Sequence, residues 1–201
     1  MTALFAVAGY LAGSMPFGYW LVRATKGVDI RTVGSGNIGA SNVWRTYGRW
    51  YGITAALLDI LKAFVPALTA TLVAGHLAGV VAGAAAMLGH WRPLILGFQR
   101  GGKMVATCAG AFLGVAPLVA LSGAVVWVAA FLLFRYASLA SILAACSLPV
   151  VAAALDEPWP VIGLAIAAAP AVVLLHRANI ARLRAGTESR FTFRKGVAAR
   201  A

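Results

Sequence analysis

The chain has 201 residues, of which 62% are apolar, and its mean hydropathy is +0.88. Soluble domains are about 45–50% apolar, so a water-soluble fold is excluded and lipid is the expected solvent for most of the surface. The 17 Lys and Arg residues outnumber 5 Asp and Glu and give a net charge of +12; because they lie in short segments between apolar runs, they indicate membrane topology and not a nucleic-acid partner.

Apolar runs of about 17–25 residues predict membrane-spanning helices. The expected spans cover residues 4–22, 51–73, 77–96, 138–155 and 159–175. Between them, the uncharged stretch 104–134 is too long for one ordinary span and short for two. Pro117, which follows Gly114, is the expected break in this stretch.

The distribution of cations settles how often the chain crosses the bilayer. Lys and Arg favour cytoplasmic loops, so Lys103 and Arg135 are both expected in the cytosol and the chain must cross twice between them. The loops near Gly75 and Asp156 contain no Lys or Arg, whereas cations continue after the last span to Arg194, Lys195 and Arg200.

The predicted fold is therefore all-α: a polytopic membrane protein, with residues 1–201 forming one domain. It has seven transmembrane helices, the fourth of them short, with the N-terminus outside and the C-terminus in the cytosol. The first cation, Arg23, follows the first apolar run, so a cleaved signal peptide is not expected.

The first polar cluster is GSGNIGASNVWRTYG, residues 34–48. Its glycines permit turns in which successive backbone N–H groups point at an anion. Asn37 is expected to cap a short helix on which Asn42 and Arg45 share a face. Loop N–H groups and the Arg45 guanidinium can then meet at one phosphate. The alternative is an ordinary cytosolic loop with an interfacial helix.

The second polar cluster is GHWRPLILGFQRGGKMVAT, residues 89–107. His90 lies near the end of the third expected span. Gly101 and Gly102 are expected to offer backbone N–H groups beside Lys103, where a new helix begins and carries about half a positive charge. This arrangement suits a phosphate, and the alternative is a basic hairpin that serves topology alone.

The third polar cluster is HRANIARLRAGTESR, residues 176–190. His176 and Asn179 share a helical face at i, i+3. The alternative is a cationic tail that meets anionic lipid. Because all three clusters fall on the cytosolic side, together they predict one basic pocket at the inner membrane surface.

Two charges fall inside the second expected span, Asp59 and Lys62. Charges at membrane depth usually pair, so mutual neutralisation is expected; the alternative is that Asp59 orients a site residue from behind. The other carboxylates of the cytosolic half, Asp29 and Glu188, are far away in sequence, so no metal site is expected.

At these clusters the chain resembles the acyl-phosphate-dependent glycerol-3-phosphate acyltransferases of bacteria, the PlsY family. Residues 34–45, 89–107 and 176–188 resemble the three motifs of the family in order and spacing, and the likeness covers nearly the whole chain. One departure is Met104, where the family usually has glycine. A side chain there is expected to narrow the pocket floor or to alter the start of the helix.

The resemblance implies an enzyme without a cofactor that transfers an acyl group from acyl phosphate to the 1-hydroxyl of glycerol 3-phosphate. The products are lysophosphatidic acid and phosphate, in phospholipid biosynthesis. It also implies a multi-pass protein of the bacterial plasma (inner) membrane with its active site facing the cytosol. The expected partners are the two substrates, membrane lipid and the soluble enzyme that produces acyl phosphate.

The clusters and the resemblance together predict two groups of site residues. The expected catalytic residues, which contact phosphate or developing negative charge, are Ser35, Arg45, His90 and Lys103. The expected substrate-binding residues are Gly36, Asn37, Asn42, Gly101, Gly102, Thr107, His176 and Asn179.

Acyl phosphate is a mixed anhydride, so positioning and charge stabilisation can lower the barrier. The hydroxyl proton has two candidate acceptors: His90, a residue type that titrates near neutral pH, and a substrate phosphate oxygen, the route proposed for the family. The competing function is a transporter or translocator of a phosphorylated solute or lipid. That function needs a polar route across the bilayer, and the outer half of this chain is nearly uncharged.

Overall fold

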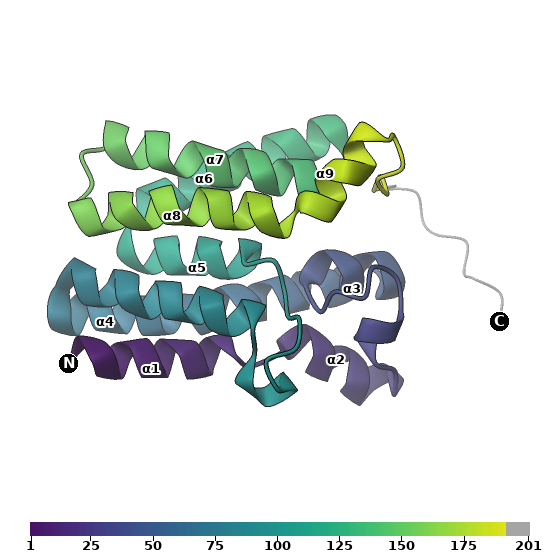
Figure 1. Ribbon diagram of the computed structural model, residues 1–201, viewed down its shortest axis with the longest axis horizontal. Coiled ribbons are helices and arrows are strands. Elements are labelled where there is room, and N and C mark those ends of the chain that lie inside the picture. Colours follow the sequence, from purple (N-terminus) through teal and green to yellow (C-terminus); the bar gives the residue numbers. More distant parts are fainter. Residues whose placement is uncertain (192–201) are drawn as a thin grey trace.

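The computed structural model describes residues 1–191, and all regular structure in that range is helical (Figure 1). The longer helices run side by side along the long axis of the molecule. The predicted cytosolic cations Arg194, Lys195 and Arg200 lie outside the described residues.

The first expected span is broken in two. Helix α1 (Thr2–Gly13) ends before Pro16, and α2 (Phe17–Lys26) begins directly after it. Proline has no N–H to donate, so the helical ladder is interrupted. The neighbouring Met15 carbonyl accepts a hydrogen bond from Lys62 Nζ at 2.7 Å.

Two short helices follow α2 at the same end of the bundle (Figure 1). They are η1 (Ile30–Thr32) and α3 (Ala40–Tyr47). Asp29 begins η1 by accepting a hydrogen bond from Arg31 N at 2.9 Å. This end of the molecule therefore carries the first polar cluster.

Helix α4 (Arg49–Trp91) contains the second expected span and most of the third, which ends at Trp91 and not at residue 96 because Pro93 cannot continue the helix. Gly75 within it has φ 82° and ψ 175°, a conformation that glycine adopts readily. The chain reverses there, since a Cβ built at Gly83 would lie 3.5 Å from Ala67 Cβ. The two halves of α4 therefore form a hairpin whose turn lies at the end opposite to α3 (Figure 1).

The uncharged stretch divides at Pro117, as the sequence predicts. A short apolar helix, α5 (Val105–Val115), follows η2 (Leu94–Leu96), and α6 (Pro117–Phe134) begins with the proline. The remaining helices are α7 (Ala137–Ala154), α8 (Trp159–Leu175) and α9 (Arg177–Arg184). The axes of α8 and α9 differ by 58°.

Helix α5 lies at the centre of the bundle, between α4 and α8 (Figure 1). Phe112 on α5 is fully buried. Gly110 lies against the backbone of Ile60, and Gly83 lies against Ala111. Small residues at such contacts let membrane helices approach closely. The middle of α5 is therefore packed closely against both halves of α4.

The outer surface of the helices is apolar. Leu72, Leu133 and Trp159 are 76%, 71% and 75% exposed, as expected for side chains that face lipid. Within residues 1–191, four helical segments are long and apolar enough to cross a bilayer, and a fifth is obtained if α8 and α9 form one bent span.

Candidate active site

The three polar clusters lie at the same end of the bundle, where α3, the start of α5 and α9 gather (Figure 1). A pocket of about 360 Å³ is found there. Its polar wall takes side chains from all three clusters: Ser35, Asn37, Asn42, Arg45, His90, Lys103, His176 and Asn179. The structure thus brings most of the predicted site residues together, while what they bind stays a prediction.

Asn42, which is buried on α3, shapes the loop that precedes this helix. Its Oδ1 accepts a hydrogen bond from Ser35 N at 2.9 Å. Its Nδ2 donates to the carbonyls of Val33 at 3.1 Å and Asn37 at 2.9 Å. A Cβ on Gly34 would overlap Asn42 Oδ1, so the loop needs glycine there. The Asn42 amide is occupied by the loop and acts on a ligand only through it.

Asn37 joins the first cluster to the second. Its Oδ1 accepts from Gly39 N at 2.8 Å, and its Nδ2 donates to Gly101 O at 3.0 Å. The prediction that Asn37 caps α3 is wrong: the helix begins after Gly39 without a side-chain cap bond. Asn oxygen readily bonds the N–H two residues on, and that turn forms here instead. Gly36 is exposed on this loop and does not line the pocket.

Gly101 and Gly102 fold back onto the end of α4. Their N–H groups donate to the carbonyls of Trp91 and His90, each at 2.9 Å. A Cβ on Gly102 would overlap the His90 imidazole, so only glycine permits this approach. The prediction that these N–H groups face an anion is wrong, because both are bonded to chain carbonyls. The two glycines instead hold Lys103 at the pocket.

A series of hydrogen bonds orients the side chain of Lys103. The sequence does not predict this series. Lys103 Nζ donates to Asn179 Oδ1 at 2.5 Å, and Asn179 Nδ2 donates to Glu188 Oε1 at 2.7 Å. Ser138 Oγ also donates to Glu188 Oε1, and Arg182 Nε donates to Oε2, each at 2.7 Å. Glu188 therefore fixes which way the Asn179 amide faces. The available signal was that Glu188 is the only acid in the cationic segment 176–190.

The charges around Lys103 favour an anionic ligand. Burial lowers the pKa of Lys103 to about 8; Glu188 opposes this change, and nearby arginines add to it. Burial raises the pKa of Glu188, but hydrogen bonds from Ser138, Asn179 and Arg182 outweigh burial, so the net pKa is lowered. The carboxylate is thus ionised at neutral pH, and the ammonium would be stabilised by a further negative charge.

Arg45 approaches the pocket from α3. Its Nη2 donates to Ser189 O at 3.2 Å, and its Cζ lies 4.5 Å from the centroid of the Phe191 ring. A guanidinium has five N–H donors. Since one bond is made to the chain, several donors remain for a ligand.

A buried polar group lies behind the pocket. Lys62 Nζ forms an ion pair with Asp59 Oδ1 at 2.7 Å, and both side chains are 2% exposed. The prediction that these charges neutralise one another is confirmed. Lys62 Nζ also lies 2.9 Å from His90 Nδ1. Asp59 and His90 both line the pocket, and Asp59 Oδ1 lies 3.7 Å from His90 Nδ1, so Asp59 is also next to a predicted site residue.

Two residues of the second cluster belong to the core and not to the pocket wall. Thr107 is fully buried, and its hydroxyl donates to Met104 O at 3.0 Å; the predicted substrate contact is therefore wrong, and the hydroxyl closes the first turn of α5. Met104 has φ 65°, a region that disfavours side chains. Its side chain is buried outside the pocket, so it does not narrow the pocket floor, and an effect on the start of α5 stays a prediction.

The pocket continues into an apolar arm between α6 and α7 that the motifs do not predict. The arm is lined by small residues at helical spacing: Ala120, Gly123, Ala124, Ala144 and Ala145. Leu148 and Phe112, both buried, are the lining residues farthest from the polar end on α7 and α5. Helix-facing alanine and glycine leave the room that larger side chains would fill.

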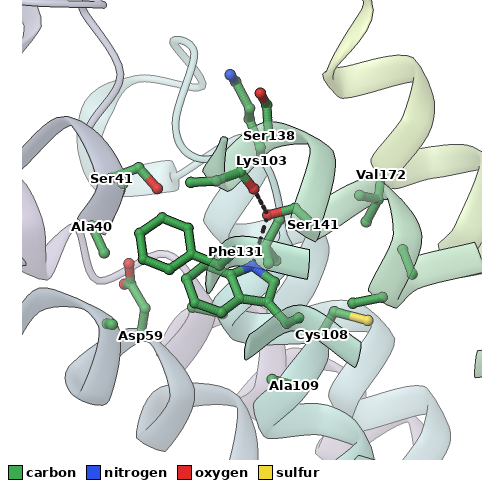
Figure 2. A pocket seen from close by; sticks show the side chains of 18 of the residues that line it. Ala40, Ser41, Asp59, Lys103, Cys108, Ala109, Phe131, Ser138, Ser141 and Val172 are labelled. Carbon is green, nitrogen blue, oxygen red and sulfur yellow. Dashed lines mark hydrogen bonds between the residues drawn. The ribbon is translucent and has the colours of Figure 1, made fainter. Parts of the chain in front are cut away.

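Aromatic and polar groups meet where the apolar arm joins the polar end. Trp127 stacks on Phe131 with ring centroids 4.9 Å apart, and Trp127 Nε1 donates to Ser141 Oγ at 3.1 Å. In Figure 2, Lys103 lies at one side of the pocket with Ser138, and Cys108 lies at the other. The pocket therefore has two different walls, one cationic and one apolar.

The two walls determine what the pocket can bind. Arg45 and Lys103 suit an anionic group, and the apolar arm suits a hydrocarbon chain attached to it. Among residues 1–191, no group of three or more His, Cys, Asp or Glu side chains is placed to hold a metal ion.

Comparisons with known proteins return one kind of protein. The model of the family described as glycerol-3-phosphate acyltransferase matches residues 3–186. A glycerol-3-phosphate acyltransferase of Geobacter sulfurreducens is 48% identical over 189 residues, which cover 94% of this chain and 96% of its own. One of Aquifex aeolicus is 45% identical over 194 residues, with 95% and 100% covered.

Two crystal structures of PlsY (YgiH), an integral membrane glycerol 3-phosphate acyltransferase, have a similar fold. The glycerol 3-phosphate form has a TM-score of 0.90 and 42% identity, covering 95% of this chain and 96% of that chain. The lysophosphatidic acid form has a TM-score of 0.87 and 41% identity, covering 95% of both chains.

Proposed function

Because the chain belongs to the glycerol-3-phosphate acyltransferase family, we propose that it transfers an acyl group from acyl phosphate to the 1-hydroxyl of glycerol 3-phosphate. The products would be lysophosphatidic acid and inorganic phosphate. The chain is an integral membrane acyltransferase of phospholipid biosynthesis; the donor, the acceptor hydroxyl and the products are the proposal.

The observation that carries this proposal is the continuity of two unlike walls in one pocket. Arg45 and Lys103 lie at the polar end, and the apolar arm runs from there between α6 and α7. A long-chain acyl phosphate has an anionic head and a hydrocarbon tail, and would use both walls at once. The related crystal structures are described as glycerol 3-phosphate and lysophosphatidic acid forms, the proposed acceptor and the proposed product.

In the proposed reaction the acceptor hydroxyl oxygen attacks the carbonyl carbon of acyl phosphate, and the bond from that carbon to the phosphate oxygen breaks. The hydroxyl proton passes to an oxygen of the substrate phosphate, which leaves as inorganic phosphate. Arg45 and Lys103 hold the phosphate charges, and Ser35 with its loop stabilises the developing oxyanion. Asn37, His176 and Asn179 position glycerol 3-phosphate.

We also propose that the whole chain, residues 1–201, is one acyltransferase domain with seven spans. The two halves of α4 would be separate spans and α5 a short fourth one, with the N-terminus outside and the C-terminus in the cytosol. This orientation is supported by α3, the start of α5 and α9, which lie at one end of the bundle (Figure 1) and carry or adjoin Arg45, Lys103 and Arg182, because cations favour the cytoplasmic side. The site would face the cytosol from the bacterial inner membrane, where a soluble enzyme could supply acyl phosphate.

The proposal is tested with the purified full-length chain, a long-chain acyl phosphate and glycerol 3-phosphate. We expect phosphate release that depends on glycerol 3-phosphate and matches lysophosphatidic acid formation by mass spectrometry. Lys103→Ala should lower kcat/KM about 10³-fold, as loss of a preorganised charge contact does. Arg100→Ala is the matched control, because Arg100 precedes the same helix but does not line the pocket; its charge lowers the pKa of Lys103, so its removal favours the ammonium and should not reduce activity.

The opposite outcome is equally measurable. Wild-type protein that releases no phosphate at saturating substrate, but moves a phosphorylated solute into vesicles, would replace the proposed enzyme reaction with transport. Release of phosphate without formation of an ester would mean that water, and not glycerol 3-phosphate, is the acceptor.

A further inference from the structure

Lys62, on the first half of α4, is surrounded by three groups that can accept a hydrogen bond. Its Nζ donates to Met15 O at 2.7 Å, forms an ion pair with Asp59 Oδ1 at 2.7 Å and lies 2.9 Å from His90 Nδ1. An ammonium group has three N–H donors and no acceptor. The Asp59 contact is an ion pair and not an aligned hydrogen bond, since Asp59 Oδ1 has no hydrogen-bond partner among the described residues. Because the ammonium has no lone pair, the His90 Nδ1 beside it must present one.

The reverse arrangement, with His90 Nδ1–H donating to an uncharged Lys62 amine, is disfavoured by Asp59. The Asp59 side chain is 2% exposed, and its Oδ1 lies 3.7 Å from His90 Nδ1, beyond hydrogen-bond distance. Without the Lys62 ammonium, a buried carboxylate would have no close counter-ion, which is strongly unfavourable.

We infer that Lys62 and Asp59 are a positioning pair that fixes His90 as the neutral tautomer with its proton on Nε2. Nδ1 is occupied by Lys62, and Nε2 has no hydrogen-bond partner among residues 1–191. The imidazole lines the pocket. The side chain is 3% exposed, and Nε2 lies beside Gly102, where a Cβ would overlap it. An occupant that reaches Nε2 past Gly102 therefore meets an N–H donor and no lone pair that could accept its proton.

His176 shows the opposite arrangement in the same pocket. Its Nδ1 lies 2.8 Å from the carbonyl oxygen of Val172. A carbonyl can only accept, so Nδ1 carries a proton. Burial lowers the pKa of His176 to about 4, so the imidazole is neutral near pH 7 and Nε2 keeps its lone pair. The pocket thus holds one histidine whose free nitrogen donates and one whose free nitrogen accepts.

This difference assigns the two histidines to different substrate groups, a step that rests on the proposed function. An N–H donor suits an oxygen of acyl phosphate, because phosphate and carbonyl oxygens only accept. A lone pair suits the hydroxyl of glycerol 3-phosphate, which can donate. The proton of that hydroxyl then cannot pass to His90.

The tautomers are tested by ¹⁵N NMR of the full-length protein labelled at histidine, a measurement that needs no activity. The chain has three histidines, and His76→Gln and His90→Gln assign their signals; His76 is exposed beside the Gly75 turn and serves as the control. We expect His90 to show an unprotonated Nδ1 and a protonated Nε2, and His176 the reverse.

A protonated Nδ1 on His90, alone or together with a protonated Nε2, would overturn the inference even in a fully active enzyme. Conversely, a wild-type protein that shows the expected tautomers but does not transfer acyl groups would refute the proposed function alone. The double variant Asp59→Asn/Lys62→Met removes both buried charges together, so no unpaired ion remains. We expect it to shift His90 to mixed tautomers and to leave the His176 signals unchanged.

Kinetics of His90 variants provide a second test if the double variant does not fold. Glutamine offers an N–H near the Nε2 position but cannot act as a base. We expect His90→Gln to keep kcat/KM within about tenfold of wild type and His90→Ala to lose about 10²-fold, the usual effect of losing one preorganised donor. Equal loss in two folded variants would overturn the donor assignment.

Discussion

At the polar end of the pocket, side chains are held by hydrogen bonds from distant parts of the chain, whereas the apolar arm is walled mainly by alanine and glycine. Lys103, Asn179 and Glu188 form a connected series at the first end. In the arm, Gly123 and Ala145 only leave space. The shape of the polar end is therefore determined by hydrogen bonds between particular atoms, whereas the shape of the arm is determined by the small size of the side chains that line it.

These two ways of building a wall respond differently to substitution. A directed bond is lost when either partner changes, and the remaining partner then points in a new direction. A wall made of small residues tolerates polarity changes poorly but fails most clearly when volume is added. Substitutions in the polar end should therefore affect all substrates, and substitutions in the arm only those with long chains.

Among residues outside the pocket lining, the largest effect is expected at Glu188, which touches no proposed substrate group. Glu188→Ala removes the acceptor that orients Asn179, and it also lowers the pKa of Lys103 below about 8, because Glu188 raises that pKa now. We expect kcat/KM to fall about 10²-fold or more.

The measurement compares acyl transfer by Glu188→Ala, Glu188→Gln and the control Glu157→Ala. Glu157 lies between α7 and α8, whose connection is at the end of the bundle opposite to α9 (Figure 1). Glutamine keeps an oxygen acceptor but not the charge, so its activity should be intermediate. Wild-type activity in folded Glu188→Ala would show that Asn179 and Lys103 are oriented without it.

The second effect is expected at Gly123 in the apolar arm. A Cβ there would already lie 2.8 Å from Leu148 Cδ2, so Gly123→Leu fills the arm. We expect about 10- to 100-fold lower kcat/KM for long acyl phosphates, since overpacking costs about 1–3 kcal/mol, and little change for short ones.

Gly163→Leu is the matched control for volume, because within residues 1–191 nothing apart from its own helix backbone lies within 4 Å of a Cβ at Gly163. Acyl transfer is measured over a series of donor chain lengths for both variants. If Gly123→Leu slows short and long donors equally, the arm does not hold the chain, and the comparison between the two ends of the pocket fails.

A smaller effect is expected from pH, and it belongs to the polar end alone. The pKa of Lys103 lies at about 8, so its ammonium is lost as pH rises through that value. If the charged form binds phosphate, kcat/KM should fall by up to about tenfold for each pH unit above 8. The kcat profile should fall only at higher pH, because bound phosphate favours the ammonium.

Lys103→Arg distinguishes this titration from others. A guanidinium stays charged throughout the accessible range, so the alkaline fall of kcat/KM should disappear, at a lower overall level. An unchanged fall in this variant would assign the titration to a different group.

The sequence predicts the helical class, the break at Pro117 and the gathering of the polar clusters, because apolar length and cation placement carry that information. It does not predict the link from Lys103 to Asn179, which are 76 residues apart, since a motif names donors and acceptors without pairing them. The sequence predicts the wrong role for Gly101 and Gly102 for a related reason: glycine serves anion binding and close packing equally well.

The apolar arm cannot be predicted from the sequence, for a different physical reason. Small residues at helical spacing also let two membrane helices pack tightly, as Gly83 and Ala111 do on α4 and α5. Ala144 and Ala145 have the same composition but line a cavity. Only the spacing between whole helices separates these two outcomes, and that spacing depends on residues throughout the bundle.

The smallest effect is expected at Met104, which belongs to neither wall. Its φ of 65° costs about 1–2 kcal/mol for a residue with a side chain. Its side chain is 4% exposed, and removing such a buried side chain costs about 2–5 kcal/mol. Packing should therefore outweigh strain, so Met104→Gly should lower the free energy of unfolding by about 1–3 kcal/mol and change kcat/KM little.

Met104→Ala separates the two contributions to stability at this position. Alanine removes nearly the same packing but keeps the strained φ, so it should be less stable than Met104→Gly by about 1 kcal/mol, the reverse of the usual order within helices. Thermal unfolding in detergent measures this difference as about 2–4 °C for a chain of this size. A more stable Met104→Ala would show that Met104 carries no backbone strain, and the usual glycine of the family would then need another explanation.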